Sequence, residues 1–159
     1  MTIDEIIALV QSFEGTLAFT AGPEDGSPEI AWGDTFFYYA PDGKMPKATQ
    51  PFATIVTKNY PDDEQSHLDR AGAFRVNIGA GKASFVERIG REAGELPVAE
   101  APAEDDTVIA HPVYGSQGWL AVVNPGPSTE TTVRQLLREA YEHARSRYER
   151  RAALGQHDG

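Results

Sequence analysis

His111 is the residue of this chain whose type and surroundings best suit chemistry. It precedes Pro112 and lies close to Tyr114 and Trp119 in the segment V-I-A-H-P-V-Y-G-S-Q-G-W-L-A-V-V. An imidazole titrates near neutral pH, so it could act as a general base or bind a ligand. A histidine in a loop at a strand edge could equally hydrogen-bond to the backbone, and both interpretations stay open. His111, Tyr114 and Trp119 are therefore candidates for a binding pocket.

An aromatic segment earlier in the chain supplies two further candidates for the same pocket. Trp32 and Asp34 lie in E-I-A-W-G-D-T-F-F-Y-Y-A, a segment rich in residues that favour strands. Both could face the pocket. A tryptophan in the core and an aspartate in a turn would explain them equally well.

A possible anion site lies between residues 74 and 82, F-R-V-N-I-G-A-G-K. A strand, a glycine turn and the start of a helix would direct the N–H groups of Gly79 and Gly81, and the Lys82 ammonium, toward an anion. The phosphate-loop pattern is incomplete, because Val76 and Ala83 occupy positions that require glycine and Ser or Thr. An ordinary connection from a strand to a helix is the alternative interpretation.

No metal or cofactor is predicted. The acidic group Asp62, Asp63 and Glu64 with His67 resembles a hard-cation site in composition, but its spacing does not direct several ligands toward one point. The chain contains no cysteine, no G-x-S-x-G motif and no H-E-x-x-H pair. These absences weaken the hypothesis of an enzyme.

The charge of the chain limits its partners. Its net charge is −10 over 159 residues, which repels nucleic acid and anionic membranes at long range. Only the C-terminal segment offers a basic face, through Arg145, Arg147, Arg150 and Arg151. The chain shows no signal peptide and no long apolar run, so we predict a cytoplasmic protein, monomeric or homodimeric, that does not bind membranes.

The strand that organises the predicted fold is Trp119–Val123, an apolar run between two turn signals. A long helix should follow over residues 129–153, with an apolar stripe that faces the sheet. A shorter helix should begin at the capping box of Thr2 and Glu5. Residues 91–106 should form a mobile acidic loop and residues 154–159 a frayed tail.

Further strands are predicted at residues 17–19, 29–40, 52–58 and 73–78, with a short helix over residues 79–89. The whole is one domain, 1–159. Its predicted class is α+β: a curved antiparallel sheet of about four to six strands, with the N- and C-terminal helices packed on one face.

Long segments of the chain resemble an uncharacterised family common in streptomycetes and related actinobacteria. The segments are P-E-I-A-W-G-D-T-F-F-Y-Y-A-P-D-G, Q-P-F-A-T-I-V-T-K, F-R-V-N-I-G-A-G-K and V-I-A-H-P-V-Y-G-S-Q-G-W-L-A-V-V-N-P-G-P. A more distant resemblance is to MmcQ/YjbR-like proteins. It rests on Phe13-Glu14-Gly15, Gly118-Trp119 through Val123, and Ala140-Tyr141. The resemblance implies a CyaY-like sheet and, for some members, DNA binding through wing-like hairpins.

Three functions are compatible with these observations. The first is a non-catalytic domain that binds an unknown small molecule or a protein. The second is a hydrolase or transferase that uses the His111 loop. The third is a DNA-binding module that uses the arginine-rich end of the last helix, which the acidic body disfavours.

Overall fold

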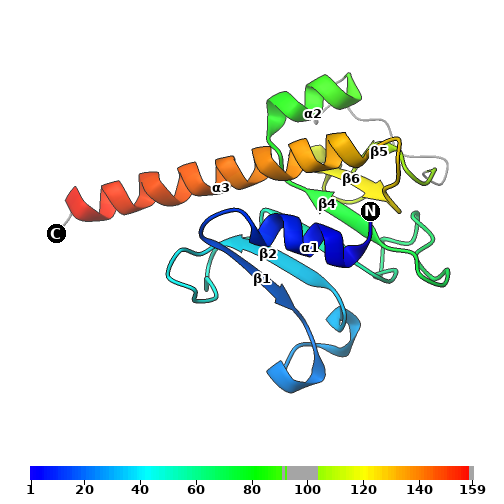
Figure 1. The fold of residues 1–159 in the computed structure, drawn as a ribbon, viewed down its shortest axis with the longest axis horizontal. Helices are drawn as coiled ribbons and strands as arrows, with labels where there is room; N and C mark the ends of the chain where they lie inside the picture. Colours follow the sequence, from blue (N-terminus) through cyan, green and yellow to red (C-terminus); the bar gives the residue numbers. More distant parts are fainter. Residues whose placement is uncertain (91, 93–103, 158–159) are drawn as a thin grey trace.

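The computed structural model describes residues 1–90, 92 and 104–157, which form an antiparallel sheet accompanied by helices (Figure 1). The helices are α1 (Ile3–Gln11), α2 (Lys82–Ile89) and α3 (Glu130–His157). The strands are β1 (Thr16–Thr20), β2 (Thr35–Tyr39), β3 (Ala53–Val56), β4 (Arg75–Ile78), β5 (Val108–Ala110) and β6 (Leu120–Val123). Within the described residues, no helix has the length and apolar character needed to cross a membrane.

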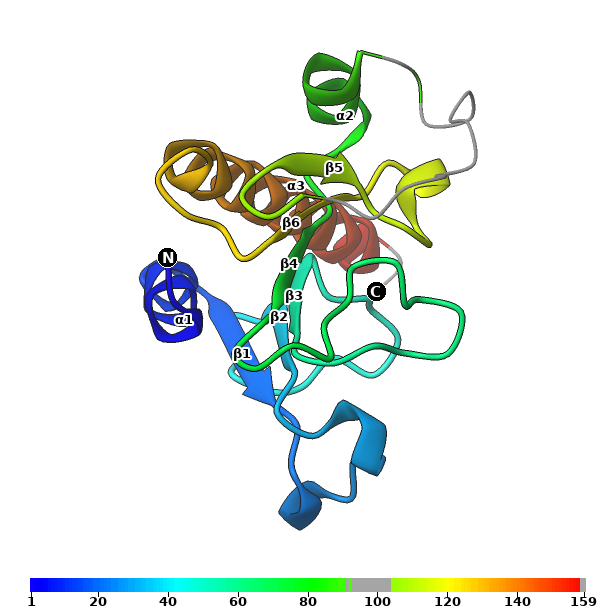
Figure 2. The ribbon, with the colours of Figure 1, turned by 90° about the vertical axis from the view of Figure 1, so that its right-hand side faces the viewer.

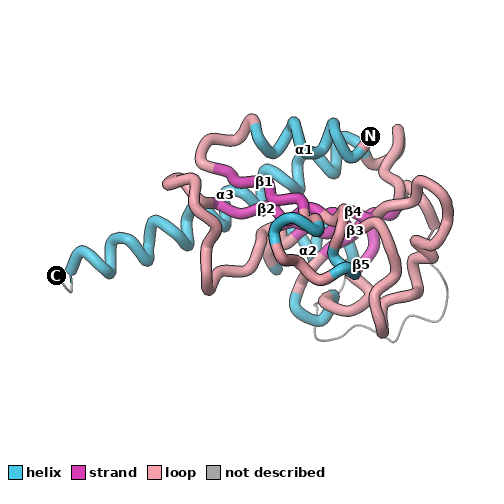
Figure 3. Tube along the Cα trace, turned by 90° about the horizontal axis from the view of Figure 1, so that it is seen from below, coloured by secondary structure: helices cyan, strands magenta, loops and turns pink. Residues whose placement is uncertain are grey.

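The six strands form one sheet in the order β1-β2-β3-β4-β6-β5, and every neighbouring pair is antiparallel. Figure 2 shows α1 and the start of α3 on one side of this sheet and the connection between β3 and β4 on the other. In Figure 3, α1 lies on one side of the strands and most of the loops lie on the opposite side. The predicted α+β class is therefore confirmed.

The hydrophobic core lies between the sheet and the helices. Its side chains from α3 are Val133, Leu136, Leu137, Ala140 and Tyr141, which are all buried. They recur every three to four residues, so they share one face of the helix. α1 contributes Ile6 and Val10, and its predicted capping box at Thr2 is present. Burial of these faces positions both helices on the same side of the sheet.

The predicted inner strand is also confirmed. All four residues of β6 are buried, and β6 pairs with β4 on one edge and β5 on the other. Beyond β6 the chain turns at Asn124 and Pro125 into α3. A strand with neighbours on both edges and side chains packed on both faces favours apolar residues, and all four residues of β6 are apolar.

One carboxylate caps the start of α3. Asp106 accepts hydrogen bonds from the backbone N–H groups of Gly126 at 2.8 Å, Ser128 at 2.9 Å and Thr129 at 3.0 Å. The Thr129 hydroxyl, at 2.5 Å, contributes most to lowering the pKa of Asp106 well below its ordinary value, and the backbone donors lower it further. These donors would otherwise lack partners at a helix start. The end of the acidic segment is therefore held in place, whereas 91 and 93–103 lie outside the described residues.

Two predicted boundaries differ most from the structure. The strand predicted over 29–40 is limited to β2, because Glu29–Ala31 forms a 3-10 turn that places Trp32 outside the sheet. The helix predicted to end at Ala153 continues to His157, and residues 158–159 of the predicted tail lie outside the described residues. This C-terminal part of α3 extends beyond the sheet (Figure 1).

Candidate functional site

A polar cluster is buried on the face of the sheet that the helices leave open. Its centre is Arg75 of β4, whose side chain is only 1% exposed. Arg75 binds both carboxylate oxygens of Asp63, at 2.9 Å and 2.7 Å. Its Nε donates to Asn77 at 2.7 Å, Nη1 also donates to Ser66 at 3.0 Å, and Nη2 lies 3.2 Å from His111 Nε2. We call these five residues the Arg75 cluster.

His111 is enclosed by this cluster and by its own loop. Its Nδ1 accepts hydrogen bonds from the backbone N–H groups of Val113 at 3.0 Å and Tyr114 at 2.9 Å, while Nε2 contacts Arg75. Because Nδ1 accepts both backbone bonds, it is the unprotonated nitrogen of the neutral ring, and an added proton there would break them. Burial, and then the positive charge of Arg75, lower the pKa of His111 to about 3, against a small opposing effect of Asp63.

The Arg75 cluster ties three segments together. Asp63 and Ser66 come from the connection between β3 and β4, His111 follows β5, and Arg75 and Asn77 belong to β4. Burial alone would raise the pKa of Asp63, but the hydrogen bonds and charge of Arg75 outweigh it and lower the pKa. Arg75 is therefore the ion that makes the burial of this carboxylate possible.

A second polar cluster surrounds Asp34, which is completely buried. Oδ1 of Asp34 accepts from the backbone N–H and hydroxyl of Thr57, both at 2.8 Å, and from Lys58 Nζ at 3.1 Å. Its other oxygen accepts from the Tyr60 hydroxyl. Burial and this hydrogen bond to Asp34 raise the pKa of Tyr60, so the phenol stays protonated. Asp34 directly precedes β2, so these hydrogen bonds connect the start of β2 to the chain beyond β3.

Both clusters are closed rather than open to a ligand. Among the described residues, every buried side-chain nitrogen and oxygen has a hydrogen-bond partner. In the same part of the chain, no group of three or more His, Asp or Glu side chains could hold a metal ion. The arrangement stabilises loops on the sheet, and both ring nitrogens of His111 contact protein groups.

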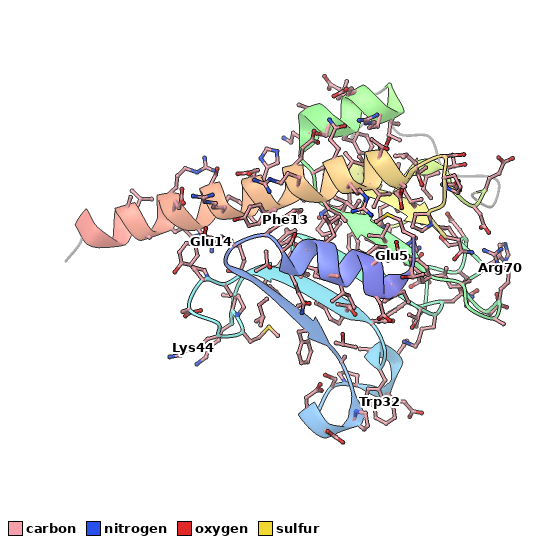
Figure 4. The ribbon with its side chains drawn as sticks, viewed as in Figure 1. Glu5, Phe13, Glu14, Trp32, Lys44 and Arg70 are labelled. Atoms are coloured by element: carbon pink, nitrogen blue, oxygen red, sulfur yellow. The ribbon has the colours of Figure 1, made fainter. Side chains whose placement is uncertain are left out.

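An open groove lies instead between the C-terminal half of α3 and the connection from β2 to β3. Its larger compartment has a volume of about 530 Å³, which is in the range of small-molecule sites. Its cations and aromatic rings are Tyr39, Lys44, Lys47, Arg147, Tyr148 and Arg151. The acid at its border is Asp42. Figure 4 shows Lys44 on the loop beside α3. We call this feature the α3 groove.

The arginines of the α3 groove differ from three others on the same helix. Arg134 pairs with Glu130, four residues earlier, whereas Arg138 and Arg145 pair with Glu142 and Glu149, four residues further along. Within the described residues, neither Arg147 nor Arg151 forms a salt bridge. Each lies one helical turn from the other, where like charges repel.

Partial burial lowers the pKa of Arg147, and repulsion from Arg151 and then Arg150 lowers it further. Arg151 donates to the Thr49 hydroxyl at 3.2 Å, across the groove. An anion placed between Arg147 and Arg151 would relieve their repulsion.

A smaller compartment of about 210 Å³ continues the groove toward the sheet. Trp119 and Gly79 line it, and it shares Arg147 and Arg151 with the larger compartment. Both arginines therefore line both compartments, which lie next to each other.

The residues predicted as site candidates lie in different places. His111 and Tyr114 remain together, with ring centroids 5.0 Å apart, whereas the Trp119 side chain lies against Gly79 in the groove. Trp32 donates its indole N–H to the Ser27 carbonyl in the β1–β2 connection, and Asp34 belongs to its own cluster.

Among the predicted anion-site residues, only Gly79 lines the groove. Gly81 lies against His143, and Lys82 is the exposed first residue of α2. Sequence reasoning identified the C-terminal arginines but did not find the groove, because its opposite wall is a loop about 100 positions away that carries Lys44 and Lys47.

The fold and these clusters define a small α+β domain with one helix-bordered cationic groove. The chain belongs to a family of unknown function, DUF6194, whose model matches residues 1–153. This match covers both walls of the groove and both polar clusters. No curated protein and no solved structure matches the chain.

Proposed function

We propose that this protein is a non-catalytic binding domain that takes a small anionic ligand in the α3 groove. The observation that carries the proposal is the convergence of Lys44, Lys47, Arg147 and Arg151 on one groove, in a chain whose net charge is −10. A protein with a net negative charge repels anions over most of its surface. The four cations gathered at the groove would therefore attract an anion only locally, as a binding site does. Charge-assisted hydrogen bonds from arginine and lysine would supply the affinity.

A non-catalytic role is supported by the surroundings of His111. Both of its ring nitrogens contact protein groups, and its lowered pKa keeps it neutral at physiological pH. A general base must reach the proton that it removes, and this imidazole is only 5% exposed. The enzyme hypothesis would need another residue to take that role.

We expect pyrophosphate to raise the midpoint of thermal unfolding, because a ligand that binds only the folded state stabilises it. Replacing both groove arginines, as Arg147→Gln with Arg151→Gln, should weaken its binding about 100-fold. Each lost hydrogen bond to a charged group contributes roughly 1.5–3 kcal/mol, and 1.4 kcal/mol is a factor of ten. Isothermal titration would measure the dissociation constants.

The matched control is Arg134→Gln with Arg145→Gln. It removes the same charge from the same helix, but both arginines are paired with glutamates outside the groove. Pyrophosphate affinity should change by less than about threefold in this control, since exposed ion pairs contribute little and screening is strong. Equal losses in the two double variants would show a general charge effect and contradict a site at the groove.

DNA binding is not part of the proposed function. We also propose a relationship to MmcQ/YjbR-like proteins, supported by the order of the elements, and an actinobacterial origin, supported by the quoted sequence segments. A cytoplasmic location remains a proposal from the sequence. We expect no submicromolar complex with duplex DNA at physiological salt, because the acidic body opposes phosphate contacts. Fluorescence anisotropy at several salt concentrations would measure this, and a submicromolar complex at physiological salt would contradict it.

A further inference from the structure

The position of Trp119 is not explained by the hydrophobic core. Its neighbours Leu120 and Val122 are completely buried in the core, but the indole is half-buried and lines the smaller compartment of the α3 groove. A large aromatic side chain that is left at a groove has a polar handle and a flat apolar surface available to a ligand.

Gly79 makes room for the indole. A Cβ atom at position 79 would lie 3.1 Å from Trp119 Cζ2 and 3.2 Å from Cε2, closer than most side-chain contacts. It would also lie 3.3 Å from the Phe52 carbonyl oxygen, which accepts a hydrogen bond from the Gly79 N–H at 2.9 Å. The backbone of Gly79 is therefore fixed beneath the ring. This contact holds Trp119 as a preformed wall of the compartment.

The guanidinium groups lie next to this aromatic wall. Arg147 and Arg151 line the same compartment as Trp119 and also border the larger one. A ligand that occupies the smaller compartment thus meets an aromatic surface and two cations together. Inorganic anions would use only the cations.

We propose that the ligand of the α3 groove is an anion that carries an aromatic ring, of the nucleoside monophosphate type. Its ring stacks on Trp119 and its phosphate binds Arg147 and Arg151. This inference rests on the proposed function and deepens it by naming the class of ligand. Bases stack on aromatic side chains regardless of their sequence, and arginine provides paired donors that match phosphate oxygens.

The experiment uses the intrinsic fluorescence of Trp119. The chain has two tryptophans, and Trp32→Phe leaves Trp119 as the only one. Trp32 lies in the β1–β2 connection, away from the loop that carries Lys44 (Figure 4), so this change spares the groove. AMP, ribose 5-phosphate and adenosine are titrated into this variant, with excitation at the red edge of the tryptophan band where adenine does not absorb.

We expect AMP to quench Trp119 and to bind at least about tenfold more tightly than either ribose 5-phosphate or adenosine, because stacking and phosphate binding each contribute about a factor of ten. Ribose 5-phosphate should displace AMP without quenching. Equal affinities for AMP and ribose 5-phosphate, or AMP binding without quenching, would overturn the inference.

A second variant tests the wall without relying on fluorescence. Trp119→Leu should weaken AMP binding about tenfold and leave pyrophosphate binding unchanged in isothermal titration. If pyrophosphate binds the wild-type protein but AMP binds no more tightly than ribose 5-phosphate, the inference fails while the proposed function stands. If neither ligand binds, both fail. If Trp119→Leu does not fold, the titration of the Trp32→Phe variant decides the question.

Discussion

Arg75→Met should lower the free energy of unfolding by about 3–5 kcal/mol, the loss typical when one partner of a buried ion pair is removed. Methionine keeps much of the volume of the arginine side chain. The measured loss of stability therefore reports mainly the removal of the guanidinium charge and its hydrogen bonds. Without the guanidinium, Asp63 keeps a largely buried carboxylate and loses both hydrogen bonds. Ser66 and Asn77 also lose a donor. Chemical denaturation measures the difference.

The control for this prediction is Arg70→Met. Arg70 pairs with Asp105 through two hydrogen bonds, at 3.3 Å and 3.0 Å, so an arginine–carboxylate pair with two bonds is removed here as well. That pair lies at the surface, where an ion pair contributes at most about 1 kcal/mol. Similar losses in the two variants would mean that burial of Arg75 does not govern its contribution.

The stability of the protein should fall as the pH decreases from about 6.5 toward 3, partly because of His111. Burial and Arg75 lower its pKa from 6.5 to about 3 in the folded protein. Between these values the unfolded chain binds a proton at this histidine and the folded protein does not. The contribution of neutral His111 to the free energy of unfolding is therefore complete above pH 6.5. It is lost on acidification, by at most about 1.4 kcal/mol per pH unit.

His111→Asn separates this effect from other acid-sensitive groups. An asparagine Oδ1 can take the place of Nδ1 and accept from the N–H groups of Val113 and Tyr114, but it does not titrate. The pKa values of Asp63 and Asp106 are also lowered, and both groups remain in the variant. The difference in unfolding free energy between wild type and variant should be constant above pH 7 and decrease below it. A difference that stays constant down to pH 4 would contradict the assigned role of His111.

The same variants bear on function. If His111→Asn retains the affinity for pyrophosphate, the Arg75 cluster stabilises the fold and the groove binds the ligand independently. If affinity is lost while stability at pH 7 is unchanged, His111 would have a role in binding, and the α3 groove would not be sufficient.

The predictable part of this fold depends on residues that are close in sequence. The apolar stripe from Val133 to Tyr141 identifies a helix that must cover a sheet, because residues three and four apart share a helix face. The capping box at Thr2 and the apolar run before Asn124 similarly mark a helix start and an inner strand. These local patterns were sufficient for the α+β class and for the side of the sheet that the helices cover.

The position of the polar residues was decided only by the tertiary structure. Alternation along β4 places Arg75 and Asn77 on one face, but it does not indicate what covers that face. The loops that carry Asp63 and His111 cover it, since Arg75 can bind both. The α3 groove likewise joins Lys44 and Lys47 to arginines on a helix far along the chain. Such pairings depend on how loops fold back over long separations, which no local spacing encodes, whereas helices and strands follow from neighbours along the chain.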